Sequence, residues 1–85
     1  MPKINEGMFR LEIRLDDHNP AHCHAVCSDG EVKIRLTIDD AVLYPMLSKS
    51  PIRGNLDKAT VKKALKAARK HRVELLNLWN QYHGD

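Results

Sequence analysis

The chain has 85 residues, of which 42% are hydrophobic and 29% are charged, and its formal net charge is +3. These values indicate one small globular domain, and no apolar run approaches the roughly 18–20 residues that a membrane-spanning helix needs. The first seven residues lack the apolar core of a signal peptide, so we expect a cytoplasmic location. Residues 1–47 carry five basic and eight acidic side chains, whereas residues 48–85 carry nine and three. This asymmetry allows acidic partners, nucleic acid included, although a solvated lysine face on a helix explains the same charges.

Apolar and polar residues alternate from Met8 to Leu15, which predicts a half-buried strand. The polar segment that follows turns at Asn19–Pro20, because proline restricts the residue before it to extended conformations. Two further strands, over about residues 22–28 and 31–38, flank Asp29–Gly30, a dipeptide typical of a two-residue hairpin turn.

Pairing across this two-residue turn sets Cys23 opposite Leu36 and Ala25 opposite Ile34. These apolar pairs predict which face of the hairpin is buried, and they place Cys23 and Cys27 on the core side. We therefore expect both cysteines to be small buried apolar residues. A disulfide between them is excluded on a strand, where residues four apart are separated by about 13 Å.

Asp39–Asp40 predicts another turn, Val42–Met46 a weak fourth strand and residues 48–54 a loop rich in Ser, Pro and Gly. Asp57 is a suitable N-cap for one long helix, Lys58–Tyr82, which carries an apolar stripe at helical spacing. Such a helix is about 38 Å long, whereas an eight-residue strand spans about 26 Å. Its end should therefore overhang the sheet.

The predicted fold is α+β, with residues 1–85 forming a single domain. It consists of an antiparallel meander of three or four strands, one face of which is covered by the long C-terminal helix. If Trp79 is partly uncovered at the overhanging helix end, we expect a weak homodimer contact there. The predicted core comprises Phe9, Leu11, Ile13, Leu15, Cys23, Ala25, Val32, Ile34, Leu36, Val61, Leu65, Ala68, Leu75 and Trp79.

The segment Asp16–His24 concentrates the groups that bind metals, move protons or hold anions, with three of the five histidines and two adjacent acids. His22 and His24 lie two apart on a predicted strand, so they point the same way and can share one divalent ion such as zinc. His18 or Asp17 from the turn is a candidate third ligand, which would leave a position open for water. Such a site suits a small metal-dependent hydrolase or ribonuclease.

The predicted register supports a second interpretation of the same segment. Aligned core faces set Arg14 opposite His24 on one side, and the hairpin sets Arg35 opposite His24 on the other. Two guanidinium groups that converge over one imidazole should lower the pKa of His24 and bind phosphate or carboxylate. With Asp17 and His18 in the adjoining turn, this row is a candidate surface for RNA or an acidic partner protein.

Two simpler interpretations also apply to this segment. The histidines are explained equally well as polar members of a solvated sheet face, with Asp17 capping its own turn. A nucleophilic dyad of Cys23 with a neighbouring histidine is disfavoured, because adjacent strand residues point to opposite faces.

The motif at residues 17–24, Asp-His-Asn-Pro-Ala-His-Cys-His, resembles the Asp-His-x-Pro-x-His-x-His signature of domain-of-unknown-function family 4160, a group of small bacterial proteins. The Asp29–Gly30 hairpin and the run at residues 71–79 are similar to that family too. The resemblance implies a small α+β fold and a gene that lies beside that of another small protein in a toxin–antitoxin-like pair. The chain departs from the family pattern at Leu56–Asp57, where Leu-Pro is usual, and at residues 67–69, where an aromatic residue is usual.

Two functions remain open on the sequence. The first is an interaction module without a cofactor, a toxin–antitoxin-like operon partner whose Arg14–His24–Arg35 row binds an acidic protein or RNA. The second is a small metal-dependent hydrolase or ribonuclease that uses His18, His22 and His24.

Overall fold

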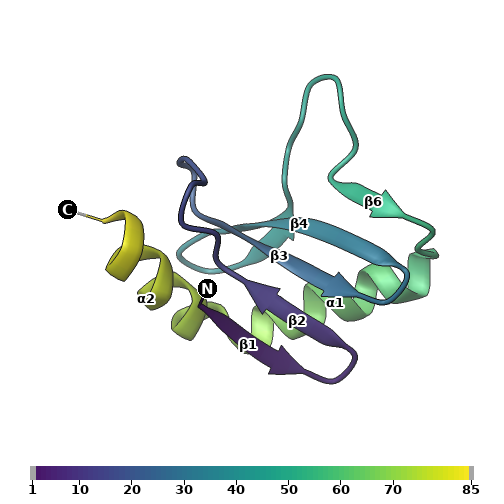
Figure 1. The fold of residues 1–85 in the computed structure, drawn as a ribbon, viewed down its shortest axis with the longest axis horizontal. Coiled ribbons are helices and arrows are strands. Elements are labelled where there is room, and N and C mark those ends of the chain that lie inside the picture. Colours follow the sequence, from purple (N-terminus) through teal and green to yellow (C-terminus); the bar gives the residue numbers. More distant parts are fainter. Residues whose placement is uncertain (1, 85) are drawn as a thin grey trace.

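The computed structural model describes residues 2–84, which form a six-stranded sheet followed by two helices (Figure 1). This arrangement confirms the predicted α+β class, with an antiparallel meander that precedes the helical part. No helix within residues 2–84 combines the length and the apolar character needed to cross a membrane. The elements are β1 (Lys3–Glu6), β2 (Phe9–Glu12), β3 (His22–Cys27), β4 (Gly30–Leu36), β5 (Ala41–Leu43), β6 (Ile52–Gly54), α1 (Lys58–Lys70) and α2 (Arg72–His83).

The sheet has an interrupted edge strand. Strands β1 to β5 pair antiparallel in chain order, and β6 also pairs with β4, so β5 and β6 follow the same edge of β4. The amide of Tyr44 donates to the Lys33 carbonyl at 3.0 Å, and the Lys33 amide donates to the Pro51 carbonyl at 2.7 Å. The segment between them, residues 45–50, is named here the excursion loop. The two residues that flank this loop, Tyr44 and Pro51, both bond to the backbone of Lys33 in β4. The loop rises above the sheet in Figure 1.

The sheet has more strands than the sequence predicted. Strand β1 forms in the N-terminal segment and β6 forms within residues 48–54, and the apolar pattern assigned no strand to either. Strand β2 ends at Glu12 rather than at Leu15, and Leu15 is 55% exposed instead of lying in the core. The predicted fourth strand exists, but it ends before Pro45.

The buried face of the β3–β4 hairpin was predicted correctly, but its register was wrong by two residues. Cys23 stands opposite Ile34 rather than Leu36, and Gly30 already belongs to β4, where it pairs with Cys27. A slip of two residues keeps every side chain on its face, because strand side chains alternate with period two. The apolar pattern is therefore the same in both registers.

Gly30 was predicted to lie in the hairpin turn, but it lies in β4, at a position where β6 approaches closely. It pairs with Gly54, and a Cβ atom on Gly30 would overlap the backbone carbonyl of Arg53. Both glycines have positive φ angles, 152° at Gly30 and 88° at Gly54, which other residues rarely adopt. The close contact between the two strands thus explains why position 30 is a glycine. The turn of the hairpin consists of residues 28–29.

The single predicted helix is divided at His71. The predicted cap is confirmed, since the Asp57 carboxylate accepts a hydrogen bond from the Thr60 amide at 2.8 Å. At His71 the backbone has φ −108° and ψ 20°, although helical hydrogen bonds continue through it from Leu75 to the His71 carbonyl. The His71 ring contacts Glu6 of β1, which fixes the junction against the sheet. The helical pattern runs unbroken through this point, so it did not signal the division.

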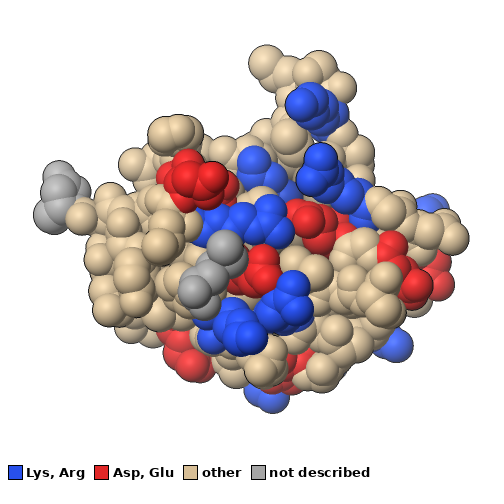
Figure 2. All heavy atoms as spheres, viewed as in Figure 1, with Lys and Arg blue, Asp and Glu red and all other residues tan. Residues whose placement is uncertain are grey.

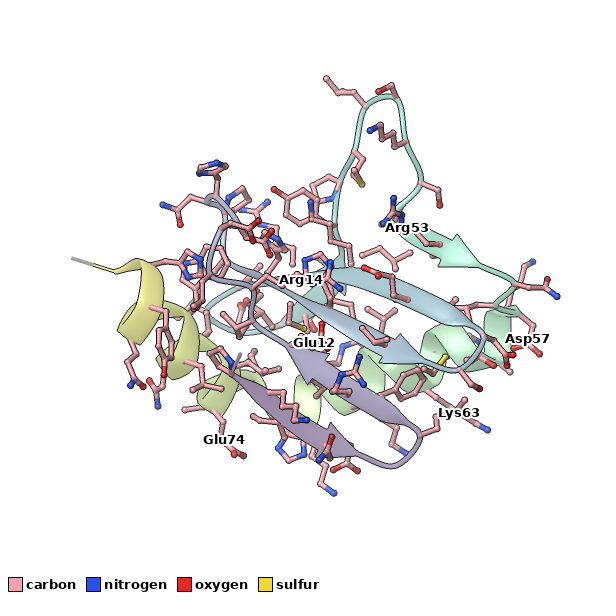
Figure 3. All side chains as sticks on the ribbon, viewed as in Figure 1. Glu12, Arg14, Arg53, Asp57, Lys63 and Glu74 are labelled. Carbon is pink, nitrogen blue, oxygen red and sulfur yellow. The ribbon has the colours of Figure 1, made fainter. Side chains whose placement is uncertain are left out.

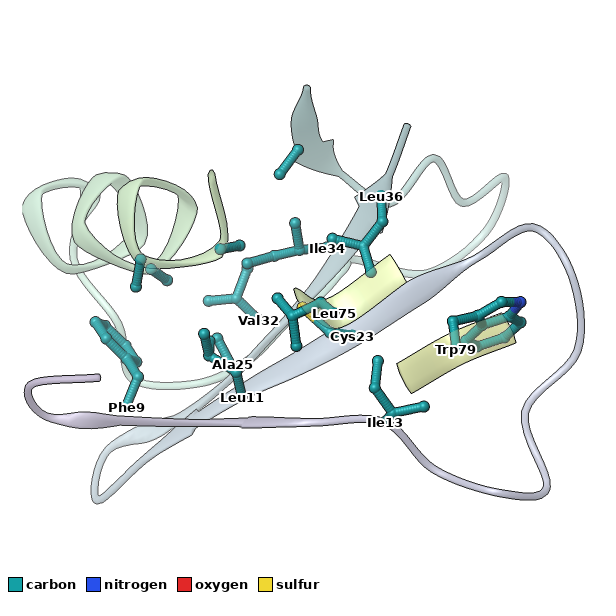
Figure 4. Close-up of a cluster of buried hydrophobic side chains, with 14 of the residues drawn as sticks. Phe9, Leu11, Ile13, Cys23, Ala25, Val32, Ile34, Leu36, Leu75 and Trp79 are labelled. Carbon is teal, nitrogen blue, oxygen red and sulfur yellow. The ribbon is translucent and has the colours of Figure 1, made fainter. Parts of the chain in front are cut away.

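The core lies between the sheet and the two helices (Figure 4). Apart from Leu15, which is exposed, and Leu65, which is only partly buried, the predicted core residues are buried. Helix α1 contributes Ala64, Ala67 and Ala68 to this layer, so its backbone can lie close to the strands.

Trp79 does not have the exposed position that the prediction of a homodimer contact requires. Its side chain packs within the core and is 3% exposed. The His83 ring stacks on it with 3.9 Å between ring centroids. The condition on which the predicted homodimer contact depended, a partly uncovered Trp79, is therefore not met.

Candidate metal centre

Three side chains converge at the start of β3. His22 and His24 alternate along this strand with Cys23 and Ala25, which face the core, and Asp17 comes from the preceding loop. Asp17 Oδ2 lies 3.0 Å from His22 Nε2 and 2.9 Å from His24 Nε2. One ligand atom from each of the three residues lies within 4.8 Å of the other two.

The tautomer of His22 follows from its second nitrogen. His22 Nδ1 lies 2.9 Å from the Pro20 carbonyl oxygen, which only accepts hydrogen bonds, so Nδ1 carries the hydrogen. Burial lowers the pKa of His22 below its ordinary value, which favours the neutral ring. In that form Nε2 carries a lone pair. Among residues 2–84 this atom has no hydrogen-bond partner, although the side chain is only 2% exposed.

The Nδ1 atom of His24, like that of His22, has an oxygen acceptor, which in this case is a carboxylate. Its Nδ1 lies 3.0 Å from Glu31 Oε2, and Arg14 holds the other oxygen of Glu31 at 3.3 Å. Burial acts to raise the pKa of Glu31, but the hydrogen bond to His24 and the charge of Arg14 outweigh it and lower that pKa. Glu31 is thus an ionised acceptor that directs the second nitrogen of His24 toward Asp17.

The Asp17 carboxylate is ionised as well. Burial acts to raise the pKa of Asp17, but the hydrogen bond with His24 and the positive charge of nearby side chains, Lys33 among them, outweigh it and lower that pKa. A negative oxygen therefore faces the bare nitrogen of His22. Two acceptors at 3.0 Å without a hydrogen between them repel one another unless a cation lies near both.

The two distances from Asp17 to the histidines fit ligands of one metal ion. Imidazole nitrogens and carboxylate oxygens bind Zn²⁺ at about 2.0–2.2 Å, which places two such ligands about 2.8–3.6 Å apart for angles between octahedral and tetrahedral values. The observed separations of 2.9 and 3.0 Å fall at the short end of this range. Both rings also donate from Nδ1 to an oxygen acceptor, as metal-binding histidines almost always do.

Aromatic rings surround the buried side of the cluster. The His22 ring centroid lies 4.9 Å from that of Tyr44 and 5.2 Å from that of Trp79. Lys33 Nζ lies 4.2 Å from the Tyr44 ring centroid. The site therefore has an apolar wall behind His22, whereas Asp17 retains partial exposure, with 20% of its side chain accessible.

The structure does not bring together the three histidines His18, His22 and His24 that the sequence suggested as metal ligands. His22 and His24 come together with Asp17, whereas His18 is exposed and lies outside the group. The sequence signal that could have chosen between the two turn residues is weak, because a polar loop without regular structure does not fix side-chain directions. Cys23 faces away from this site, and burial raises the pKa of its thiol to about 12. Both findings agree with the expectation that Cys23 forms no nucleophilic dyad with a neighbouring histidine.

The predicted row Arg14–His24–Arg35 is not formed. Glu12 and Lys33 stand opposite His24, because both strand registers differ by two residues from the predicted ones. Arg14 turns toward the carboxylates of Glu12 and Glu31. Arg35 stands opposite His22 instead. Carboxylates rather than guanidinium groups therefore hold the imidazole of His24.

No curated protein and no solved structure matches the chain. Residues 8–80 match the model of a family described as Domain of unknown function (DUF4160), and this span includes Asp17, His22 and His24. The match confirms the resemblance that the motif at residues 17–24 indicated. The chain therefore belongs to the DUF4160 family.

Proposed function

We propose that Asp17, His22 and His24 bind one divalent transition-metal ion and that the chain is a small metal-dependent hydrolase. The observation that carries the proposal is the buried Nε2 of His22, which lacks a hydrogen bond within residues 2–84 while an ionised oxygen of Asp17 lies 3.0 Å away. A metal ion satisfies both atoms at once. A hydrogen bond between them would need a hydrogen on Nε2, but the Pro20 carbonyl already holds the ring hydrogen on Nδ1.

The number of ligands supports a catalytic rather than a purely structural ion. Structural zinc sites are usually closed by four protein ligands, whereas catalytic sites have three and leave a position for water or substrate. Two imidazoles and one carboxylate suit zinc, and also iron, cobalt or nickel. A bound ion would supply Lewis acidity and a water that is acidic enough to attack near neutral pH.

The residues around the ligands have supporting roles. Glu31 and the Pro20 carbonyl fix the ring orientations of the two histidines, and Arg14 in turn holds Glu31. Such outer contacts orient the ligands before an ion arrives and typically change metal affinity by about 10–100-fold. The apolar wall of Tyr44 and Trp79 keeps water from the back of His22.

The interaction-module interpretation has less support from this geometry. Its arginine row depended on a register that the chain does not adopt. A role beside a second small protein, as in a toxin–antitoxin-like pair, stays a prediction from the family resemblance.

Cobalt binding tests the proposal directly. Co²⁺ absorbs visible light with an intensity that depends on its coordination, so titration of the metal-free protein should give a saturating spectrum at one ion per chain. Asp17→Asn should weaken binding at least about 100-fold, because it removes the anionic ligand. His18→Gln is the matched control, since it changes an exposed histidine in the same loop, and it should bind cobalt as the natural chain does.

Two results would overturn the proposal. One is a natural chain that binds neither cobalt nor zinc at micromolar concentrations. The other is a His18→Gln variant that loses binding as Asp17→Asn does, because His18 would then be the ligand. Circular dichroism of each variant establishes that it is folded before its metal affinity is compared.

A further inference from the structure

A cavity of about 180 Å³ adjoins the candidate metal centre, and His24 belongs to the lining of the cavity as well as to the centre. Elements far apart in the sequence form its wall: the segment after β2, the middle of β4, the excursion loop and the start of β6. Four basic side chains and one acidic side chain line it, namely Arg14, Lys33, Lys49, Arg53 and Glu31. The cavity is therefore strongly basic, although the front half of the chain is acidic overall.

Most of this positive charge is not neutralised within the described chain. Arg14 forms ion pairs with Glu12 and Glu31. Within residues 2–84, Lys33, Lys49 and Arg53 have no carboxylate at ion-pair distance. Figure 2 shows basic groups gathered across this face of the sheet and up toward the excursion loop. In Figure 3, Arg14 and Arg53 approach the same region from the β2 side and from β6.

We propose that this basic cavity binds the phosphate group of a phosphate ester and that the ester is the substrate of the metal centre, an inference that rests on the proposed function. In the reaction the oxygen of water forms a bond to phosphorus, and the bond from phosphorus to the ester oxygen breaks. The released alcohol takes up one proton of the water, and the other stays on the phosphate product or passes to solvent. The bond order at phosphorus and the total charge are conserved.

The chemistry of the lining favours phosphate over a carboxylate-rich protein surface. Arginine forks and lysine ammonium groups match a tetrahedral oxyanion from several directions, and they neutralise the charge that develops on it during hydrolysis. The cavity holds the volume of roughly six water molecules at about 30 Å³ each, which suits one phosphate group with part of its ester. A flat acidic protein surface cannot enter a concavity of this size.

The shared residue His24 explains why the cavity and the centre should act together. One of its nitrogens faces Asp17 in the centre, and the other faces Glu31, which lines the cavity. An anion in the cavity would therefore lie on the Glu31 side of His24, and an ion in the centre would lie on its Asp17 side. The cations on the cavity wall would then hold the ester while the centre supplies the attacking water.

Two charge-removing variants with the same loss of charge test the inference. Lys49→Ala with Arg53→Ala removes two cations of the cavity, and Lys58→Ala with Lys62→Ala removes two exposed cations of α1. Each zinc-loaded protein is given bis(p-nitrophenyl) phosphate, a diester, and p-nitrophenyl phosphate, a monoester, and its affinity for inorganic phosphate is measured by calorimetry. Cobalt affinity is measured in parallel as a readout that the cavity cations should not change.

We expect the cavity variant to raise the KM for the preferred ester about tenfold and to weaken phosphate binding similarly, with a smaller change in kcat and unchanged cobalt affinity. The α1 variant should behave as the natural chain does. Faster hydrolysis of bis(p-nitrophenyl) phosphate would identify the substrate as a diester, as in nucleic acids. Faster hydrolysis of p-nitrophenyl phosphate would identify it as a monoester.

Failure of the inference can be told apart from failure of the centre. If cobalt binds but neither ester is hydrolysed and phosphate does not bind, the inference is wrong and the centre stands. If the α1 variant loses as much phosphate affinity as the cavity variant, binding is non-specific and the inference is also wrong. If cobalt does not bind, the proposed function itself is wrong, and the inference fails with it.

Discussion

Asp17→Asn is the sharpest test of the candidate centre, because it should have opposite effects with and without metal. At pH 8 in the absence of metal, the carboxylate oxygen of Asp17 faces the bare Nε2 of His22 at 3.0 Å without a hydrogen bond. An amide nitrogen in the position of Oδ2 can donate one hydrogen to His22 Nε2. The substitution thus supplies a donor where the natural chain has two acceptors facing each other, and it replaces the carboxylate oxygen that is hydrogen-bonded to His24 Nε2 by a neutral amide.

The expected change in the free energy of unfolding differs between the metal-free and the metal-bound protein. A buried acceptor without a partner costs about 1–3 kcal/mol, so the metal-free Asp17→Asn variant should match or exceed the free energy of unfolding of the natural chain by up to about that amount. With metal at 100 times its Kd, the natural chain should gain about 2.7 kcal/mol, and the variant should gain almost nothing. For a domain of this size the gain corresponds to a rise in Tm of about 10–20 °C.

The assay is urea denaturation with EDTA and with excess zinc, followed by circular dichroism, for the natural chain, Asp17→Asn and the control His18→Gln. If Asp17→Asn destabilises the metal-free chain by more than about 2 kcal/mol and still responds to zinc, the reasoning is refuted. Asp17 would then be an ordinary acceptor for a charged His24, and the ion would bind elsewhere. The His18→Gln control should follow the natural chain in both conditions.

Three further predictions concern the supporting contacts and the core. Glu31→Gln should weaken cobalt affinity by about 10–100-fold while the site still binds, because Glu31 orients His24 without being a ligand, and absorbance titration measures this. Hydrogen bonds to Glu6 and Glu74 raise the pKa of His71, so its charged form adds stability that is complete below the ordinary value of about 6.5 and disappears as pH rises through the raised value. In urea denaturation His71→Gln should therefore destabilise the chain more at pH 6 than at pH 9, and an equal loss at both values would contradict this. Leu75→Ala should cost about 2–5 kcal/mol because the side chain is fully buried, and a calorimetric loss below about 0.5 kcal/mol would contradict the packing.

The periodic parts of the sequence predicted the faces of the elements but not their exact partners. Leu11 and Cys23 lie on the buried face as expected, because alternation with period two defines a face. The same alternation is unchanged by a slip of two residues, and such a slip in each of the two registers replaced Arg14 by Glu12 and Arg35 by Lys33 beside His24. The two ring nitrogens of His24 are therefore held by carboxylates rather than covered by guanidinium groups.

The candidate site was predicted in part for the same reason. His22 and His24 belong to a strand, so their common direction could be deduced from spacing. Asp17 and His18 belong to an irregular loop, where neighbouring side chains have no fixed relation to the strand, and only the structure separates the inward carboxylate from the exposed imidazole. The basic cavity could not be predicted, because Arg53 joins Arg14 and Lys33 only through the pairing of β6 with β4, and no strand was expected there.

The excursion loop gives the cavity one wall that can vary without a change in the sheet. Both ends of residues 45–50 are anchored to the two backbone groups of Lys33, so lengthening the loop leaves every other pairing of β4 unchanged. Doubling the length of a flexible loop costs only about 0.6 kcal/mol of closure entropy. This position is therefore suited to the grafting of new segments, through which the substrate range of the scaffold could be altered while Asp17, His22 and His24 keep their positions.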